Sequence, residues 1–337
     1  MQSSITSLPI VIVHYNTPDL LRGCLRSLRD CTRPLQVVVV DNASTDRTVE
    51  TLQGEFPGVR FIYNKENRGY AAANNQGIRE TLREFTALGS DALAAARPPH
   101  LAQPLVAGQT LAGLSAILLL NPDTVVQPGA IETLVSFLET HPQAGAIGPR
   151  LLNPDGSLQE NAFTFPTLPM SFFDFFPLHG RLYHSRLNGR FPEMRGERPF
   201  PIDHPLGACL LLRGAALQEV GLLDEGYFVY VEEVDLCYRL KQAGWEVWHV
   251  PAARVVHYGG QSTKQVSERM VVELHRSRYR FFHKYYPAPF RFFHRQIIRL
   301  GLWWRGRQDR EACAQGKITP AQLAARLAAY GEIRALR

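Results

Sequence analysis

The sequence predicts an α/β protein in which helices cover both faces of a mostly parallel β-sheet. Short apolar runs, such as ILLL at 117–120, have the length of a strand buried on both faces and are too short for a buried helix. These runs alternate with segments whose apolar residues recur at helical spacing. An order of strand, helix, strand and helix favours parallel strands joined by crossover helices.

Each element follows from a local pattern, as the first strand and helix illustrate. After the apolar run at 9–14, Thr17, Pro18 and Asp19 supply an N-cap, a proline at the first helical position and an early acid. By such criteria, strands are expected at 9–14, 36–40, 59–63, 117–120, 144–147, 209–212, 246–250 and 254–257. Helices are expected at 18–28, 47–53, 71–84 and 128–140, and from about residue 232.

Two regions interrupt this order. Residues 86–115 are rich in Ala, Pro, Gly and Leu with weak periodicity, and we interpret them as an insertion. Residues 151–201 are irregular and aromatic, which predicts a loop-rich region suited to covering a site.

The composition is that of a globular protein with a large core, since 45% of its residues are hydrophobic and 20% are charged. Its five cysteines form no CxxC pair, which indicates reduced thiols in a cytosolic protein. The N-terminus lacks the basic start of a signal peptide, and no apolar run reaches the roughly 18 residues of a membrane span. We therefore expect a cytoplasmic protein that contacts a membrane only from its surface.

The formal charge of +6 comes from one segment near the C-terminus. Residues 276–307 contain nine Arg and Lys, no acid and ten aromatic residues. Aromatic side chains with positive charge suit an anionic membrane surface. Alternatively, the aromatics pack on the rest of the protein and the arginines are solvated. Single-stranded nucleic acid would require basic residues spread over a groove of the main domain, so we expect no nucleic-acid partner.

Polar residues follow three of the expected strands at the point where each strand ends. They are Asn16 after the first strand, Asp41 and Asn42 after the second, and Asn121 and Asp123 after 117–120. Parallel strands bring their carboxyl ends to one edge of the sheet, where ligands bind in open α/β folds. Because Pro122 ends its strand, Asp123 lies just beyond it and is a candidate ligand for a divalent cation and the phosphates that the cation bridges. The alternative is an ordinary turn.

The sequence contains neither of the common glycine-rich phosphate motifs. No GxGxxG follows the first strand, and no GxxxxGK occurs. Phosphates would therefore need a metal on Asp123 and the backbone of a loop such as 67–70, which includes Arg68 and Gly69. Gly69 permits close approach of the backbone, although a plain turn glycine explains it equally well.

An acidic cluster begins the helix expected from about residue 232. Glu233 shares a face with apolar residues at spacings of three, four and seven. A carboxylate on an apolar face is partly desolvated, which raises its pKa toward that of a useful general base. Asp235 shares the other face with Glu232 and Arg239, which is typical of a solvated, ion-paired side. Alternatively, all three acids simply stabilise the helix N-terminus.

A histidine ends the last expected strand. His257 precedes two glycines in VVHYGGQS, a position from which it can ligate a metal or contact a phosphate. The alternative is a structural histidine.

Seven motifs together resemble the inverting glycosyltransferases of family 2, which have the GT-A fold, and above all their rhamnosyltransferase-like branch. In chain order the motifs are PIVIVHYNTPDLL, VVVVDNASTDRT, NRGYAAANNQGI, ILLLNPDT, GACLLLR, FVYVEEVDLCYRLKQAGW and VVHYGGQST. The resemblance implies a Rossmann-like GT-A domain at 8–265, with the insertion at about 86–115, and leaves a basic, aromatic, helical region at 266–337.

The resemblance also implies roles for individual residues. The nucleotide-sugar site would comprise Asn16, Asp41, Asn42, Arg68, Gly69, Asn121, Asp123 and Gly207. Asp41 would contact the base of the nucleotide. Asp123 would stand in the DxD position of the family and hold Mg²⁺ or Mn²⁺, with His257 as a further metal or diphosphate contact. Glu233 falls at the position of the catalytic base, which is commonly Asp in a Glu-Asp pair, so Glu232 remains a competing candidate.

The implied reaction is transfer of a sugar, with inversion, from a nucleoside diphosphate donor to a hydroxyl of a glycan or lipid-linked acceptor in cell-envelope polysaccharide synthesis. Rhamnose on dTDP is the first donor suggested, and UDP-linked and GDP-linked sugars remain open. A lipid-linked acceptor would place the protein peripherally on the inner face of the cell membrane. The alternatives are a nucleotidyltransferase and a non-catalytic nucleotide- or glycan-binding relative. A nucleotidyltransferase would require a basic, glycine-rich loop after the first strand, but residues 15–19 have the sequence YNTPD.

Overall fold

The computed structural model describes residues 5, 7–46, 48–87, 114–176, 180–259 and 267–336. The insertion expected at 86–115 therefore lies almost wholly outside the described residues. The described strands are β1 (Leu8–His14), β2 (Leu35–Asp41), β3 (Arg60–Tyr63), β4 (Ala116–Leu120), β5 (Thr124–Val126), β6 (Ala144–Leu152), β7 (Leu158–Gln159), β8 (Ala162–Phe163), β9 (Phe200–Pro201), β10 (His204–Pro205), β11 (Cys209–Arg213) and β12 (Glu246–His257).

The described helices are α1 (Pro18–Ser27), α2 (Thr48–Glu55), α3 (Tyr70–Ala87), α4 (Ala130–Thr140), α5 (Leu168–Phe173), α6 (Gly180–Tyr183), α7 (Gly214–Val220), α8 (Glu232–Gln242), α9 (Ser267–Tyr285), α10 (Ala288–Ala314) and α11 (Pro320–Ala335), with two 3₁₀ turns, η1 (Arg186–Asn188) and η2 (Pro192–Arg195). No helix among the described residues is both long enough and apolar enough to cross a membrane.

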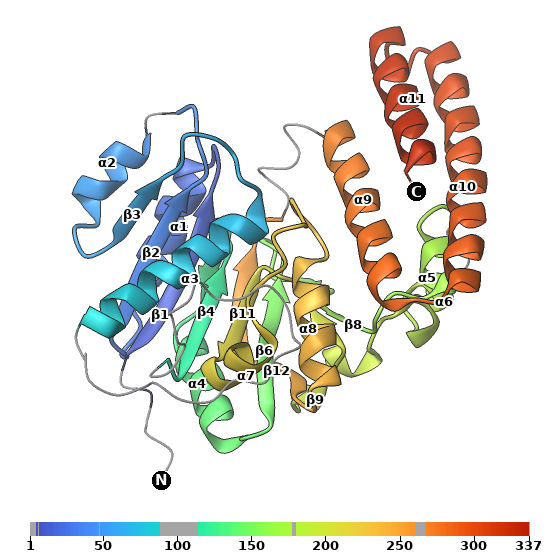
Figure 1. Ribbon diagram of the computed structural model, residues 1–337. Coiled ribbons are helices and arrows are strands. Elements are labelled where there is room, and N and C mark those ends of the chain that lie inside the picture. The colour runs from blue at the N-terminus through green and yellow to red at the C-terminus, as the bar shows by residue number, and fades with distance from the viewer. Residues whose placement is uncertain are drawn as a thin grey trace.

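One mixed sheet, with the strand order β3-β2-β1-β4-β11-β6-β12-β5, forms the centre of the molecule (Figure 1). The pairs β3-β2, β2-β1, β1-β4 and β6-β12 are parallel. Strand β11 is antiparallel to β4 and β6, because the chain enters it at the carboxyl edge, where Cys209 lies opposite Leu120. The predicted mostly parallel sheet with flanking helices is confirmed.

Two features of the sheet differ from the prediction. The strands expected at 246–250 and 254–257 are one strand, β12, with a register shift between Val250 and Arg254. The short strand β5 was not predicted, because its three residues follow a turn and leave no periodic pattern to detect. It pairs with the end of β12.

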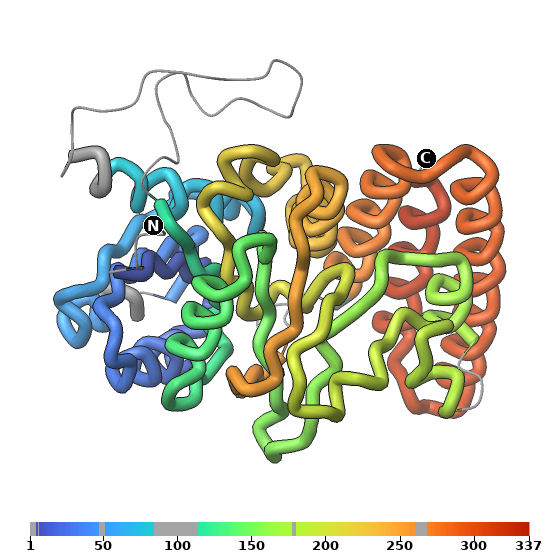
Figure 2. The backbone as a smooth tube through the Cα atoms, turned by 90° about the horizontal axis from the view of Figure 1, so that it is seen from below, coloured from blue at the N-terminus to red at the C-terminus, as the bar shows by residue number. Residues whose placement is uncertain are grey.

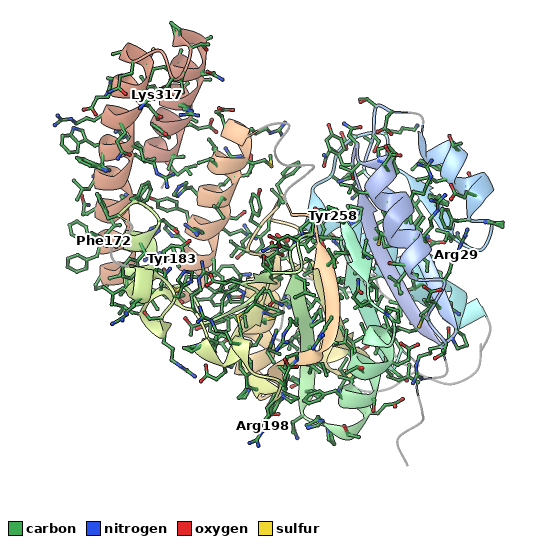
Figure 3. The ribbon with its side chains drawn as sticks, turned by 180° about the vertical axis from the view of Figure 1, so that it is seen from behind. Arg29, Phe172, Tyr183, Arg198, Tyr258 and Lys317 are labelled. Atoms are coloured by element: carbon green, nitrogen blue, oxygen red, sulfur yellow. The ribbon has the colours of Figure 1, made fainter. Side chains whose placement is uncertain are left out.

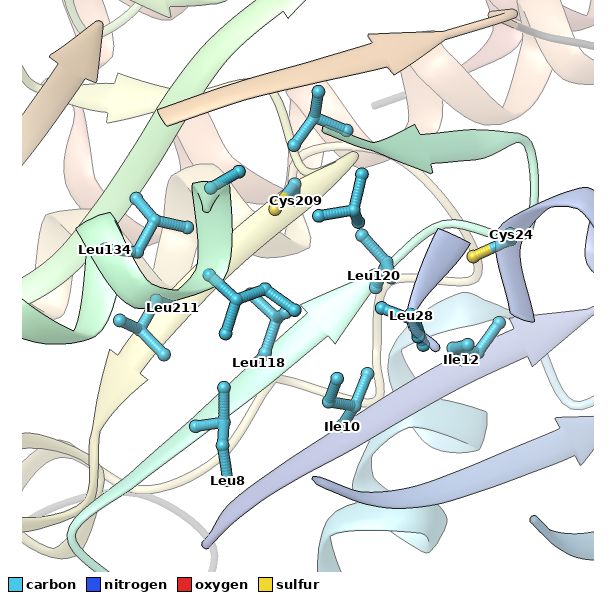
Figure 4. Close-up of a cluster of buried hydrophobic side chains, with 14 of the residues drawn as sticks. Leu8, Ile10, Ile12, Cys24, Leu28, Leu118, Leu120, Leu134, Cys209 and Leu211 are labelled. Atoms are coloured by element: carbon cyan, nitrogen blue, oxygen red, sulfur yellow. The ribbon is translucent and has the colours of Figure 1, made fainter. Parts of the chain in front are cut away.

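Alternating side chains of the buried strands pack on two helical layers. In β4, Leu118 and Leu120 join the apolar cluster that includes α1 and α4, part of which Figure 4 shows. Ile117 and Leu119 point to the other face and pack with side chains of α3, α7 and α8. Burying both faces explains why this strand reads as an unbroken apolar run.

The C-terminal region forms three helices, α9 to α11, which stand beside the sheet domain (Figures 1 and 2). The side chains of Phe281 and Phe282 on α9 are almost fully buried against Tyr227 and Val231, which precede α8. Part of the aromatic segment therefore packs on the sheet domain, as the alternative interpretation expected. The division of the chain into domains at 8–265 and 266–337 remains a prediction.

The expectation that Asp235 and Glu232 lie on a solvated side of α8 is wrong. Asp235 has no exposed surface, and Glu232 is also buried, because α9 and the loop before α8 cover this side. The carboxylate of Asp235 accepts hydrogen bonds from the hydroxyls of Tyr227 and Tyr285, at 3.1 and 3.0 Å, and pairs with Arg239 at 2.8 Å. Lys284 of α9 also donates to it.

We expect Asp235→Asn to lower the free energy of unfolding by about 3 kcal/mol, because it removes the fully buried negative charge with which Arg239 and Lys284 pair. Chemical denaturation measures this change. Asp19→Asn is the matched control, since Asp19 is 91% exposed in its pair with Arg22 and should matter far less. Equal free energies of unfolding for the two variants would show that the buried cluster does not stabilise the packing of α8 on α9.

Candidate active site

A cavity of about 570 Å³ lies beyond the carboxyl ends of β1 and β4, with the first turn of α9 forming part of its wall. Eight of the predicted site residues line it: Asn42, Gly69, Asn121, Asp123, Gly207, Glu232, Glu233 and His257. The structure thus brings together strand ends and helix starts that lie far apart in the sequence. Three predicted residues, Asn16, Asp41 and Arg68, do not line the cavity.

Asp123 and His257 meet because β5 pairs with the end of β12. Thr124 lies opposite His257 in this pair, and the N–H of Tyr258 donates to the carbonyl oxygen of Asp123 at 2.9 Å. Figure 3 labels Tyr258 at this end of the strand. The Nε2 atom of His257 is 3.4 Å from Oδ1 of Asp123, and both side chains are buried.

Gln159 determines which ring nitrogen of His257 carries the proton. The side-chain N–H₂ of Gln159 donates to Oδ1 of Asn153 at 2.9 Å and to the carbonyl oxygen of His257 at 3.3 Å, so its Oε1 faces the ring. Nδ1 of His257 lies 2.6 Å from that oxygen and donates to it. A neutral ring then directs the lone pair of Nε2 toward the carboxylate of Asp123, and two facing acceptors favour a cation at this place.

A strained turn holds the start of α8. Tyr230 and Val231 have positive φ angles of 68° and 70°, a conformation that is rare for a β-branched residue and costs about 1–3 kcal/mol per residue. The turn persists because Val231 is buried among the aromatic side chains of α9. It brings the first two residues of α8, both glutamates, to the cavity wall.

Burial changes the acidity of these two glutamates. It raises the pKa of Glu233 to about 7, and backbone hydrogen bonds partly oppose this rise. Burial and the negative charge of Glu233 raise the pKa of Glu232 well above its ordinary value. Glu232 is only 4% exposed, whereas Glu233 is half-buried. Within the described chain, the Oε2 atom of each carboxyl group is buried and accepts no hydrogen bond.

The loop before α3 is anchored to the cavity wall through Gly69. This residue has a φ of 81°, and a Cβ here would lie 2.4 Å from the carbonyl oxygen of Phe228, so any side chain would displace one of the two loops. The N–H of Tyr70 donates to the same oxygen at 2.6 Å. Asn42 holds the loop from below, accepting from the N–H of Arg68 at 3.0 Å and donating to the carbonyl of Gly69 at 3.2 Å. The side chain of Arg68 is exposed.

Asp41 and Asn16 already have intramolecular partners. The carboxylate of Asp41 lies 3.0 Å from Nδ1 of His14 and accepts from both the hydroxyl and the N–H of Ser44. Oδ1 of Asn16 accepts from the N–H of Thr45 at 2.8 Å. These contacts order the loop after β2. Contact of Asp41 and Asn16 with a nucleotide base remains a prediction.

Two residues of the cavity, Tyr70 and Gln159, are not among the predicted site residues, and each forms a hydrogen bond with one that is. The hydroxyl of Tyr70 donates to Oδ1 of Asn121 at 2.7 Å, and burial together with nearby carboxylates raises its pKa, so it stays protonated. Its place beside Gly69 in NRGY could have indicated it. Gln159 lies in the irregular region 151–201, where no pattern points to a role.

The mixed α/β sheet and a cavity that combines an acid-histidine pair with two carboxyl groups have the features expected of a transferase of the GT-A class. Residues 10–89 match the family model described as glycosyl transferase family 2, and residues 116–306 match that described as glycosyl transferase family group 2. The chain is 33% identical over 285 residues to the N-acetylglucosaminyl-diphospho-decaprenol L-rhamnosyltransferase of Mycobacterium tuberculosis, covering 81% of this chain and 83% of the relative. The chain belongs to glycosyltransferase family 2.

Other similarities agree with this assignment. The rhamnosyltransferase WbbL of Escherichia coli K12 is 25% identical over 250 residues, which cover 74% of this chain and 82% of WbbL. A solved mannosyltransferase from Pyrobaculum calidifontis, in complex with GDP-Man and Mn²⁺, superposes with a TM-score of 0.51 at 16% identity, covering 98% of this chain and 80% of that one. The similarity to the mannosyltransferase concerns the fold alone. The predicted family and its rhamnosyltransferase-like branch are confirmed.

Proposed function

We propose that this glycosyltransferase moves a hexose, with rhamnose as the first candidate, from a nucleoside diphosphate to a hydroxyl of a lipid-linked glycan. The observation that supports this most is that the pair Asp123–His257 and the carboxyl of Glu233 line one cavity. Sugar transfer needs a site for the leaving diphosphate and a base for the acceptor hydroxyl, and this cavity contains residues suited to both.

Asp123 and His257 would hold a divalent cation, Mg²⁺ or Mn²⁺, since a carboxylate and an imidazole lone pair face each other there. Among the described residues, no group of three or more His, Cys, Asp or Glu side chains could hold a metal. The remaining ligands would therefore come from the donor diphosphate and water. When bound, the cation neutralises charge that develops on the leaving diphosphate.

Glu233 is our proposed base. A base must be ionised to accept a proton, and a pKa of about 7 leaves a large fraction of Glu233 as carboxylate at neutral pH. Burial and the negative charge of Glu233 raise the pKa of Glu232 well above its ordinary value, which favours the protonated form of that group. Glu233 would take the proton of the acceptor hydroxyl as the hydroxyl oxygen attacks the anomeric carbon opposite the leaving group, which inverts the configuration.

The similar M. tuberculosis enzyme, by its name, adds L-rhamnose to an N-acetylglucosaminyl-diphospho-decaprenol. On this basis we propose a lipid-linked acceptor with a diphosphate for the present chain. The nucleotide of the donor is best determined by thermal unfolding with UDP, dTDP and GDP, each with and without Mn²⁺, because a ligand that binds the folded state raises the melting temperature. A metal-dependent rise with one nucleotide supports the proposal and identifies the donor class. The absence of any such rise would contradict it.

We further propose that α10 contacts the membrane. Its large exposed apolar side chains are Phe292, Phe293, Leu300, Trp303 and Trp304. Their spacing places them in one stripe along the helix, which also includes the exposed residues Arg299 and Arg307. No acidic residue occurs between 292 and 307, so the stripe complements an anionic lipid surface. Helix α10 lies on the opposite side of the molecule from β3 (Figure 1).

Replacing both Trp303 and Trp304 by Ala should lower partitioning onto vesicles containing phosphatidylglycerol by about tenfold, because two large apolar side chains no longer enter the interface. Sedimentation with the vesicles measures the bound fraction. Tyr63→Ala is the control, since Tyr63 is an exposed aromatic residue in β3. Unchanged binding by the tryptophan variant, or an equal loss in the control, would exclude this face as the membrane contact.

A further inference from the structure

Arg269, in the first turn of α9, lines the cavity together with Met270. Among the described residues that line the cavity, which include the acids Asp123, Glu232 and Glu233, it is the single Lys or Arg. No acidic side chain of the described chain forms an ion pair with it. An arginine that lines this cavity and forms no ion pair within the described part of the chain can bind an anionic ligand there.

Arg269 is an exposed residue whose side chain contacts the loop before α8. Its guanidinium lies over the ring of Phe228, 5.5 Å from the ring centroid. Phe228 in turn is held at its carbonyl oxygen by the N–H of Tyr70, and the absence of a side chain at Gly69 lets the two loops touch. The residue that the guanidinium contacts is therefore itself in contact with the loop at 67–70, which the sequence indicated as a phosphate loop.

We propose that Arg269 binds the pyrophosphate group of a substrate of the transfer reaction. A planar guanidinium binds phosphate oxygens with two parallel hydrogen bonds, which an ammonium cannot do. This inference rests on the proposed function. Two substrates of that reaction would carry a pyrophosphate, the nucleotide donor and the lipid-linked acceptor, and the chemistry of recognition is the same for both.

The test compares the wild-type protein with Arg269→Gln, Arg269→Lys and Arg198→Gln. Arg198 is an exposed arginine far from the cavity, at the lower edge of Figure 3, and serves as the matched control. Calorimetric titration with UDP, dTDP and GDP in Mn²⁺, and with the corresponding monophosphates, measures donor binding. KM values for an acceptor with a lipid diphosphate and for an alkyl glycoside without phosphate measure acceptor binding.

If the donor pyrophosphate is the ligand, Arg269→Gln should weaken binding of the nucleoside diphosphate about 10- to 100-fold and that of the monophosphate much less. If the acceptor pyrophosphate is the ligand, nucleotide binding stays unchanged and KM rises for the diphosphate acceptor alone. Arg269→Lys should recover part of either loss.

Unchanged nucleotide binding and unchanged acceptor KM in Arg269→Gln would overturn the inference while leaving the proposed function intact. An equal loss in Arg198→Gln would also overturn it. If the wild-type protein binds none of the nucleotides in Mn²⁺, the proposed function fails and the inference fails with it.

Discussion

Glu233→Gln should lower kcat for sugar transfer by about 10²–10⁴-fold while leaving the affinity for the nucleoside diphosphate within a few fold of the wild type. The amide has nearly the shape of the carboxyl group and cannot accept the proton of the acceptor hydroxyl. Single-turnover transfer with saturating donor measures the chemical step, and calorimetry measures binding.

Glu232→Gln is the matched control for this experiment, because the two glutamates are adjacent and both line the cavity. We expect a much smaller loss of kcat from it, since burial and the charge of Glu233 raise the pKa of Glu232 and so disfavour the carboxylate that a base requires. A larger loss in Glu232→Gln than in Glu233→Gln would transfer the role of base to Glu232.

The same assignment predicts the pH dependence of the reaction. The active form of Glu233 is the carboxylate, and its pKa is raised to about 7, so kcat/KM should rise with pH, reach half its plateau near pH 7 and level off above. The residual activity of Glu233→Gln should lack this inflection. An inflection near pH 4.5 in the wild-type protein would indicate a base that is not desolvated.

Asp123→Asn should abolish the metal-dependent part of nucleotide binding, a loss of about 100-fold or more in affinity, because a neutral amide is a poor ligand for a divalent cation. Titration with UDP, dTDP and GDP, with and without Mn²⁺, measures this loss directly. Asp30→Asn is the control, since Asp30 is exposed and lies outside the cavity lining. Retention of a metal-dependent response in Asp123→Asn would place the cation elsewhere.

The strands that carry the site were predictable because their burial leaves a simple pattern. A strand such as β4, covered on both faces, has no polar position to break its apolar run, and Pro122 marks its end. The parallel order then placed Asn42 and Asp123 at one edge of the sheet. Burial of Glu233 followed from helical spacing alone.

The contacts that depend on tertiary packing could not be predicted. Asp235, for example, pairs with Lys284, which lies 49 residues further along the chain. The family resemblance implied that Asp123 and His257 share a site, but the residue pattern alone could not, because their meeting depends on β5, which is too short to leave a periodic signal. Gln159 reaches His257 across 98 residues. Arg269 joins the cavity because α9 lies beside the loop that precedes α8, a contact that no local pattern in the sequence indicates.

The most direct test of the central claim is to incubate the protein with dTDP-rhamnose, Mn²⁺ and an N-acetylglucosaminyl-diphospho-polyprenol, and to analyse the lipid product by mass spectrometry and NMR. We predict an acceptor that is heavier by one deoxyhexose, with the anomeric configuration inverted, and no such product from Glu233→Gln. The same reaction with UDP-linked and GDP-linked hexoses covers the other donor classes. A folded protein that binds nucleotide and yet transfers no sugar from any of these donors, or that retains the configuration, would contradict the account.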